Sequence, residues 1–226
     1  SKEDMFDGHS YNKGGRILNM LRSYVGDEAF FASLKLYLTK NAHKSAEIHD
    51  LRLAFEEITG EDLNWFFNQW FLSSGHPVLK YEQEYNDSTK KLTVSITQKQ
   101  DTEKWPVYKL PIYIDIYVGG KPRRELVWVE NVENTFEFNA SSQPNLVNID
   151  AKKVLLAKKT DKKSLEQSVY QLNHAGLWLD KKEAIEKCGK SSNPVAVEAI
   201  INALSQAFWN IKTMAMSKIK KLHPNC

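Results

Sequence analysis

The chain has 226 residues, 42% of them hydrophobic and 26% charged, with a formal net charge of +3. This composition excludes an intrinsically disordered chain, and a net charge this small does not indicate a nucleic-acid-binding protein. At about 100–200 residues per domain, the length allows one large domain or two to three small ones.

The cysteines and the apolar runs exclude two further classes of protein. Only Cys188 and Cys226 occur, which is too few for a disulfide framework or a four-cysteine zinc site and leaves the compartment open. No apolar run approaches the roughly 20 residues of a membrane-spanning helix. The chain starts with SKEDMFDGHS, without an initiator Met or a signal-like pattern, so we expect it to be cut from a longer protein.

Residues 11 to about 75 are predicted to be helical throughout, because apolar residues recur at spacings of three and four. Gly26 and Gly60 are expected to end helices, and Asp27 and Asp50 to cap the helices they precede. The helix faces are marked by Ile17, Leu18, Met20, Leu21, Tyr24 and Val25; by Phe30, Phe31, Leu34, Tyr37 and Leu38; by Leu51, Ala54, Phe55 and Ile58; and by Leu63, Phe66, Phe67, Trp70 and Phe71.

We interpret these apolar stripes as core. Stripes so rich in aromatic residues need more partner surface than four short helices offer one another. The segment is therefore expected to be half of a domain, and its helices are expected to leave an apolar surface exposed.

His76 and Pro77 mark a boundary, because Pro biases the preceding residue away from helix. After it the hydrophobic period changes from 3.6 to 2, so that Leu92, Val94 and Ile96, for example, alternate with polar residues. Short antiparallel strands of this kind indicate a β-sandwich, predicted over 78–157. The predicted strands are 78–85, 91–99, 107–118, 124–131, 134–139 and 145–150.

Helical spacing returns after Ser164, and Pro194 suits the start of a helix. We expect 158–226 to open an α-helical, repeat-like domain. The basic runs at 158–164 and 217–223 are interpreted as solvated helix faces or linker.

The residues alone indicate little chemistry. None of the six histidines is followed by Glu, so the H-E-x-x-H zinc signature is absent, and so is the G-x-S-x-G nucleophile elbow. His43 and His49 are expected to be solvated loop residues, and Cys188 falls on the apolar side of its helix, where a thiol is inert.

One feature stands out: Tyr11 lies directly ahead of Lys13, Gly14 and Gly15 at the mouth of a helix. Each Gly costs a helix about 1 kcal/mol relative to Ala, so two in a row require a reason. On the residues alone, Tyr11 could simply be an amphipathic cap on a buried helix.

Four motifs in sequence give the tyrosine a second interpretation. Y-x-K-G-G-x-x-L-x-M-L-R, G-D-E-x-F, D-L-x-x-A-F-E-E-x-x-G and W-F-F-x-Q-W-F-x-x-x-G-H-P follow one another across residues 11–77. In order and spacing they resemble the zinc aminopeptidases related to aminopeptidase N. The resemblance implies an α+β multidomain chain: residues 1–77 as the helical second half of a thermolysin-like catalytic domain, 78–157 as an antiparallel β-sandwich domain, and 158–226 as the start of a helical C-terminal domain.

The resemblance also implies a role for Tyr11. In that family the tyrosine before K-G-[GA] faces the catalytic zinc and donates a hydrogen bond to the oxyanion formed on the scissile peptide carbonyl. A phenol is a neutral donor at neutral pH, and a preformed donor in a dry site acts on charge that develops in the transition state. Gly14 and Gly15 would then lack a β-carbon so that backbone can pack close behind the tyrosine.

The motifs that would bind zinc, supply the general base and hold the substrate amine belong upstream of this segment in the family. No metal ligand or cofactor-binding residue is therefore assigned, and the only catalytic residue named is Tyr11. The parent protein is expected to be a zinc-dependent aminopeptidase that removes N-terminal residues from peptides, whereas this fragment binds no zinc and is inactive alone. Its expected partners are peptide substrates and the missing N-terminal half of the catalytic domain, with no nucleic acid and no membrane span in this segment.

Two alternatives stay open on the sequence. A non-catalytic relative could use the same architecture as a protein-interaction scaffold, although such a scaffold has no need of Tyr11. An unrelated β-sandwich adhesin flanked by helices would leave the match over 11–77 unexplained. The side-chain preference, the oligomeric state and the compartment are not predicted.

Overall fold

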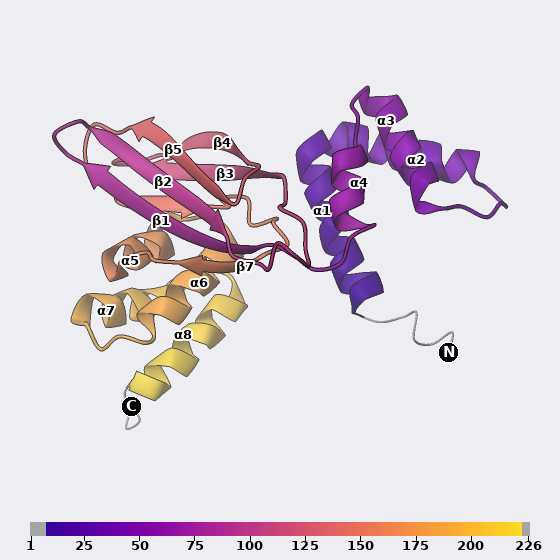
Figure 1. The fold of residues 1–226 in the computed structure, drawn as a ribbon. Helices are drawn as coiled ribbons and strands as arrows, with labels where there is room; N and C mark the ends of the chain where they lie inside the picture. The colour runs from indigo at the N-terminus through magenta and orange to yellow at the C-terminus, as the bar shows by residue number, and fades with distance from the viewer. Residues whose placement is uncertain (1–7, 223–226) are drawn as a thin grey trace.

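The computed structural model describes residues 8–222, which form a mixed α/β structure with eight α-helices and two small β-sheets. Figure 1 shows α1–α4 on one side of the sheets and α5–α8 beneath them. No helix in the described range is both long and apolar enough to cross a membrane. The first group comprises a π-helical turn η2 (His9–Lys13), α1 (Gly14–Val25), α2 (Asp27–Lys40), α3 (Ile48–Thr59) and α4 (Asn64–Trp70).

The predicted helix ends are found at the two glycines, but the two predicted N-caps are not. Gly26 and Gly60 directly follow α1 and α3 with φ of 86° and 71°, as the sequence predicts. The prediction for Asp50 is wrong in its position: Glu47 is the N-cap of α3, and the Asp50 carboxylate accepts a hydrogen bond from the Glu47 amide at 2.8 Å. Asp27 is likewise the first residue of α2 and not its cap.

The strands form a four-stranded sheet in the order β5-β2-β1-β7 and a three-stranded sheet in the order β4-β3-β6. The six strands predicted from alternation are all present, within three residues of the expected ends, and they pair antiparallel. The strands are β1 (Val78–Asn86), β2 (Lys91–Gln98), β3 (Leu110–Tyr117), β4 (Arg123–Val129), β5 (Glu133–Asn139), β6 (Leu146–Ile149) and β7 (Lys158–Asp161).

Strand β7 corrects the interpretation of the basic run at 158–164 as helix face or linker. It pairs parallel with β1, so that Tyr81 is opposite Asp161, and the Lys158 amide donates to the Pro77 carbonyl at 3.0 Å. The run contains no apolar residue, so no periodicity could indicate a strand. Pairing with the open edge of β1 determines its structure, and its charged side chains suit an edge strand.

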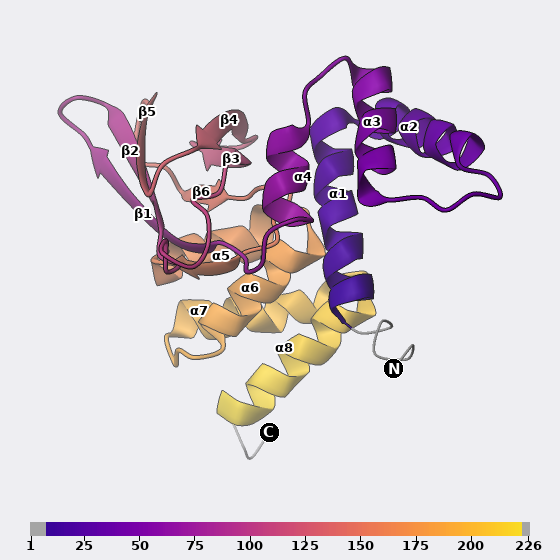
Figure 2. The ribbon, with the colours of Figure 1, turned by 45° about the vertical axis from the view of Figure 1, so that its right-hand side comes forward.

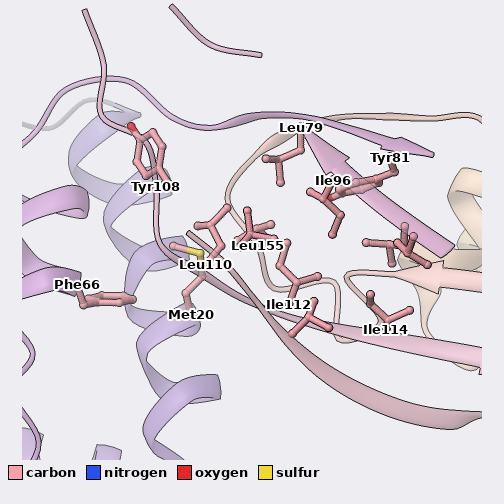
Figure 3. Close-up of a cluster of buried hydrophobic side chains, with 14 of the residues drawn as sticks. Met20, Phe66, Leu79, Tyr81, Ile96, Tyr108, Leu110, Ile112, Ile114 and Leu155 are labelled. Carbon is pink, nitrogen blue, oxygen red and sulfur yellow. The ribbon is translucent and has the colours of Figure 1, made fainter. Parts of the chain in front are cut away.

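One apolar core runs from the first helices into the space between the two sheets. Figure 3 shows Phe66 from α4 and Met20 from α1 pointing toward Leu110 of β3, with Ile112 and Ile114 following along the same strand. The side-chain amide of Gln69 on α4 also makes two 2.9 Å hydrogen bonds with the backbone of Lys109.

The expectation that the aromatic stripes would lack cover is therefore wrong for α4. Phe66, Phe67 and Trp70 are at most 3% exposed, because they belong to the core that continues between the sheets, with the Trp70 ring centroid 5.1 Å from that of Tyr108. The expectation agrees with the structure on α2, where Phe31 and Leu38 are 53% and 66% exposed. The first helices thus have one face covered by this chain and another that no described residue covers.

The last four helices have a separate apolar core that includes Cys188. Their starts follow the sequence, since Ser164 caps α5 through the Gln167 amide and Asn193 caps α7 ahead of Pro194. Figure 2 shows α5 and α6 lying directly under the sheets. The helices are α5 (Leu165–His174), α6 (Trp178–Cys188), α7 (Pro194–Asn202) and α8 (Trp209–Leu222), with a 3₁₀ turn η3 (Ala203–Ser205) between the last two.

Candidate functional site

Tyr11 lies in the π-helical turn η2, immediately before α1, and its side chain is 61% exposed. The amides of Asn12 and Lys13 both donate to the Gly8 carbonyl, at 3.0 and 3.1 Å, and the second of these bonds has the wider spacing of a π-helix. Single π turns of this kind recur at functional sites. The sequence offered no signal for the turn, because HSYNK has no hydrophobic period.

Two long-range hydrogen bonds hold the helix start on which Tyr11 lies. Lys13 Nζ donates to the Gly75 carbonyl at 3.3 Å, and Arg16 Nη2 donates to the Lys153 carbonyl at 2.6 Å. The turn is thereby attached both to the end of the helical segment and to the loop after β6. The sequence motif contains Lys13 but indicates no role for it, and no local pattern distinguishes Arg16.

Gly75 has a clear steric reason to be glycine. Its φ is 87°, in the left-handed region, and a β-carbon there would lie 2.5 Å from Cδ1 of Trp105. The Trp105 ring therefore packs directly against Gly75 of the G-H-P motif, and the carbonyl of Gly75 is the one that Lys13 binds.

Gly14 and Gly15 do not have that reason, which corrects the sequence interpretation. Apart from the adjoining residues and the backbone of the helix itself, no atom of the described chain lies within 4 Å of a β-carbon added at either position. The idea that they let backbone pack close behind Tyr11 is thus wrong for residues 8–222. In the first turn of α1, Gly15 is exposed and Gly14 is partly exposed.

An aromatic cluster fixes α1 and α4 against the second sheet. The rings of Tyr24, Trp65 and Trp128 meet edge to face with centroids 5.5 to 6.0 Å apart, and Lys109 Nζ lies 4.9 Å from the centre of the Trp128 ring. The Tyr24 hydroxyl donates to Glu61 at 2.7 Å; burial and then this carboxylate raise the pKa of Tyr24 to about 12. Tyr24 is thereby a structural tyrosine, in contrast to the exposed Tyr11.

Other candidate chemical groups are inert or scattered. Within residues 8–222, no three His, Cys, Asp or Glu side chains come together in a group that could hold a metal ion. His43 and His49 are exposed, and Cys188 is fully buried, which raises the pKa of its thiol to about 11. Cys226 lies outside the described residues. The donors of the described residues therefore do not fit zinc.

The site thus consists of one exposed phenol on a helix start that Lys13 and Arg16 attach to the rest of the chain, and the described residues include no group that could hold a metal ion. Residues 1–70, which include this turn, match the Peptidase family M1 domain. The resemblance to aminopeptidase N-related zinc peptidases, inferred from the motifs over 11–77, is confirmed by this match and by the relatives that follow.

The chain is 29% identical over 150 residues to Aminopeptidase N of Escherichia coli (strain K12), which is 59% of this chain and 17% of that protein. It is 32% identical over 140 residues to Probable aminopeptidase 1 of Sulfurisphaera tokodaii, which is 62% of this chain and again 17% of that protein. The chain therefore corresponds to about a sixth of the length of each of these two curated relatives.

A solved structure, the crystal structure of Legionella pneumophila aminopeptidase A in complex with aspartic acid, has the same fold with a TM-score of 0.81. The superposition covers 100% of this chain and 28% of the Legionella pneumophila chain. At 17% sequence identity this likeness concerns the fold alone.

Proposed function

We propose that this chain is part of a zinc-dependent aminopeptidase that hydrolyses N-terminal residues from peptides. The observation that carries the proposal is that the peptidase match over residues 1–70 includes the helix start that presents Tyr11. A protein that only binds partners has no need of an exposed phenol on this anchored helix start.

In this proposal Tyr11 is the transition-state donor. Its hydroxyl donates a hydrogen bond to the oxyanion that develops on the scissile carbonyl, where a preorganised donor is more effective than water. Its 61% exposure leaves the phenol accessible to a substrate, and the bonds from Lys13 and Arg16 fix the helix start that carries it. A phenol also stays a neutral donor at neutral pH.

The proposal assigns three parts to the chain. Residues 1–77 are the helical second half of a thermolysin-like catalytic domain, 78–157 a β-sandwich domain, and 158–226 the start of a helical domain. The apolar residues on the outer helices support the first assignment, because Phe31, Leu38 and Leu53 are each more than half exposed. The other half of the catalytic domain would cover them.

Zinc in the proposed peptidase must be held by donors other than those of residues 8–222, which do not fit it. It would supply Lewis-acid chemistry at the scissile carbonyl. The 226-residue chain by itself is accordingly expected to be inactive toward peptides.

The test is hydrolysis of a leucine amide with a fluorescent leaving group by the 226-residue chain and by a longer polypeptide that also contains the N-terminal half of the proposed catalytic domain. The longer polypeptide should cleave the free-amine substrate and not its N-acetyl derivative, because an aminopeptidase requires the terminal amine. The short chain should cleave neither. A longer polypeptide that folds, binds zinc and cleaves neither substrate would favour the scaffold instead.

A further inference from the structure

The turn at residues 150–153, after β6, has an unusual backbone. Asp150 and Lys153 have φ of 54° and 53°, so two of the four non-glycine residues with positive φ among the described residues lie in this one turn. The Lys153 amide closes the turn by donating to the Asp150 carbonyl at 2.8 Å. Left-handed backbone is unfavourable for a side chain like lysine and persists only where surrounding contacts over-determine it.

Those contacts come from both ends of Lys153. Its carbonyl accepts the 2.6 Å hydrogen bond from Arg16, in the first turn of α1. Its ammonium, on a side chain only 4% exposed, reaches Asn148 at 3.1 Å, Glu183 at 2.7 Å and Asp180 at 3.2 Å. One residue is thus held through its backbone by the first helix and through its side chain by α6.

Two carboxylates, those of Glu183 and Asp180, compensate the charge of the buried Lys153 ammonium. Burial alone would lower the pKa of Lys153, but the charges of Glu183 and Asp180 outweigh burial and raise it. Asp180 also accepts from Asn148 Nδ2 at 2.8 Å. Removing one partner from such a buried ion network leaves the others uncompensated, which is strongly unfavourable.

The loop that follows contacts α1 a second time, one turn further along. The Leu156 amide donates to Sδ of Met20 at 3.2 Å. Arg16 and Met20 are four residues apart and lie on the same face of α1. The loop at 150–156 therefore lies along the beginning of the helix that follows Tyr11, and α6 holds it from the other side.

We propose that Lys153 is a positioning residue that couples the docking of α6 to the place of the α1 start, and through it to Tyr11. The importance of Tyr11 rests on the proposed function, but the coupling itself does not. The inference is that α6 influences the candidate active site through Lys153, which is bonded both to α6 and to Arg16 of α1.

The experiment is amide hydrogen exchange on the 226-residue chain, comparing native protein with Lys153→Met. We expect exchange in the η2 turn and the first turns of α1 to accelerate at least tenfold, while α3 is unchanged. Lys163→Met is the matched control, because Lys163 is also a buried lysine near Glu183 but forms its ion pair with Asp161 of β7, at 2.8 Å, and not with Asp180 or Glu183 of α6. That variant should leave the start of α1 as in the native chain.

Coupling free energies are reciprocal, which provides a second test should Lys153→Met fail to fold. Arg16→Met removes the bond at the other end, so it should accelerate exchange in α6 around residues 180–184 as well as in α1. The coupling is refuted if Lys153→Met leaves exchange at the start of α1 unchanged, or if Arg16→Met leaves exchange in α6 unchanged. It is also refuted if Lys163→Met accelerates exchange in α1 as much as Lys153→Met does.

Activity separates this inference from the proposed function. In the longer polypeptide, Lys153→Met should lower kcat several-fold with KM nearly unchanged, and it should have little further effect in a Tyr11→Phe background. Exchange that shows coupling, together with a Tyr11→Phe variant of normal turnover, would retain Lys153 as a coupling residue and reject the role of Tyr11.

Discussion

At positions 14 and 15, nothing in the described chain sterically requires glycine. A substitution there should therefore change stability in a predictable direction. Gly15→Ala introduces a better helix former into the first turn of α1, and no described atom outside the adjoining residues and the helix backbone lies within 4 Å of the new β-carbon. We expect it to stabilise the chain by up to about 1 kcal/mol. Thermal melts should show a rise in Tm of about 2–4 °C.

Gly26 provides the matched control at the other end of the same helix. Its φ of 86° is unfavourable for any residue with a β-carbon, so Gly26→Ala should lower Tm although space is available there. A Gly15→Ala variant that melts below the native chain would show that a contact beyond the described residues requires glycine.

At the scale of elements, the attachment of α6 to the sheets depends on charge and therefore on pH. Burial would raise the pKa of Glu183, but Lys153, with Lys159 and Lys163, outweighs burial and lowers it. A carboxylate whose pKa is lower in the folded state contributes stability above its ordinary value of 4.5, and that contribution is lost as pH falls through the folded value.

The prediction concerns the difference between native protein and Glu183→Gln, since other carboxyl groups titrate in the same range. The native chain should melt at a higher temperature near neutral pH, and the difference should shrink as pH falls below 4.5. Circular dichroism melts between pH 3 and 7 measure it. Melting curves of the two proteins that stay equally far apart over that whole range would contradict the assignment.

The elements also show how far sequence periodicity reaches. Alternation predicted strands such as β2, and spacings of three and four predicted α1 and α4, because one face of each is buried. Strand β7 has no apolar residue, and its structure depends on the edge of β1. The bond between Arg16 and Lys153 joins residues 137 apart, so no local pattern could indicate it.

The candidate site was predictable only in part for the same reason. Tyr11 could be singled out because it stands before two glycines in a motif of specific spacing. The π turn around it has no hydrophobic period, and its two anchors are tertiary contacts. Likewise α4 is bonded through Gln69 to a residue 40 positions further along the chain. Local sequence predicts which residues are buried, but not which distant residues they contact.

At the scale of the whole molecule, the described chain supplies the phenol of the proposed active site but not its zinc ligands. The described residues carry an exposed phenol and no donor set that fits zinc. We therefore expect metal analysis of the extensively dialysed 226-residue chain to give zinc well below one equivalent, because isolated exposed histidines bind it weakly. A stoichiometric, chelator-resistant zinc content would overturn this expectation and require a site outside the described residues.

The measurement that tests the central claim most directly is the turnover of Tyr11→Phe in the longer, zinc-loaded polypeptide. The substitution removes one hydroxyl and nearly preserves shape, so Tm and zinc content should match the native protein. Tyr37→Phe, the same change on the partly buried side of α2, is the control and should leave kinetics unaltered.

Loss of a single oxyanion donor costs about 10²–10³ in kcat, or roughly 2.7–4 kcal/mol, and we expect a loss of this size for Tyr11→Phe. KM should change little, because the ground-state carbonyl gains less from the donor than the oxyanion does. A Tyr11→Phe enzyme with native zinc content and near-native kcat would contradict the account and leave Tyr11 as a surface residue at a helix start.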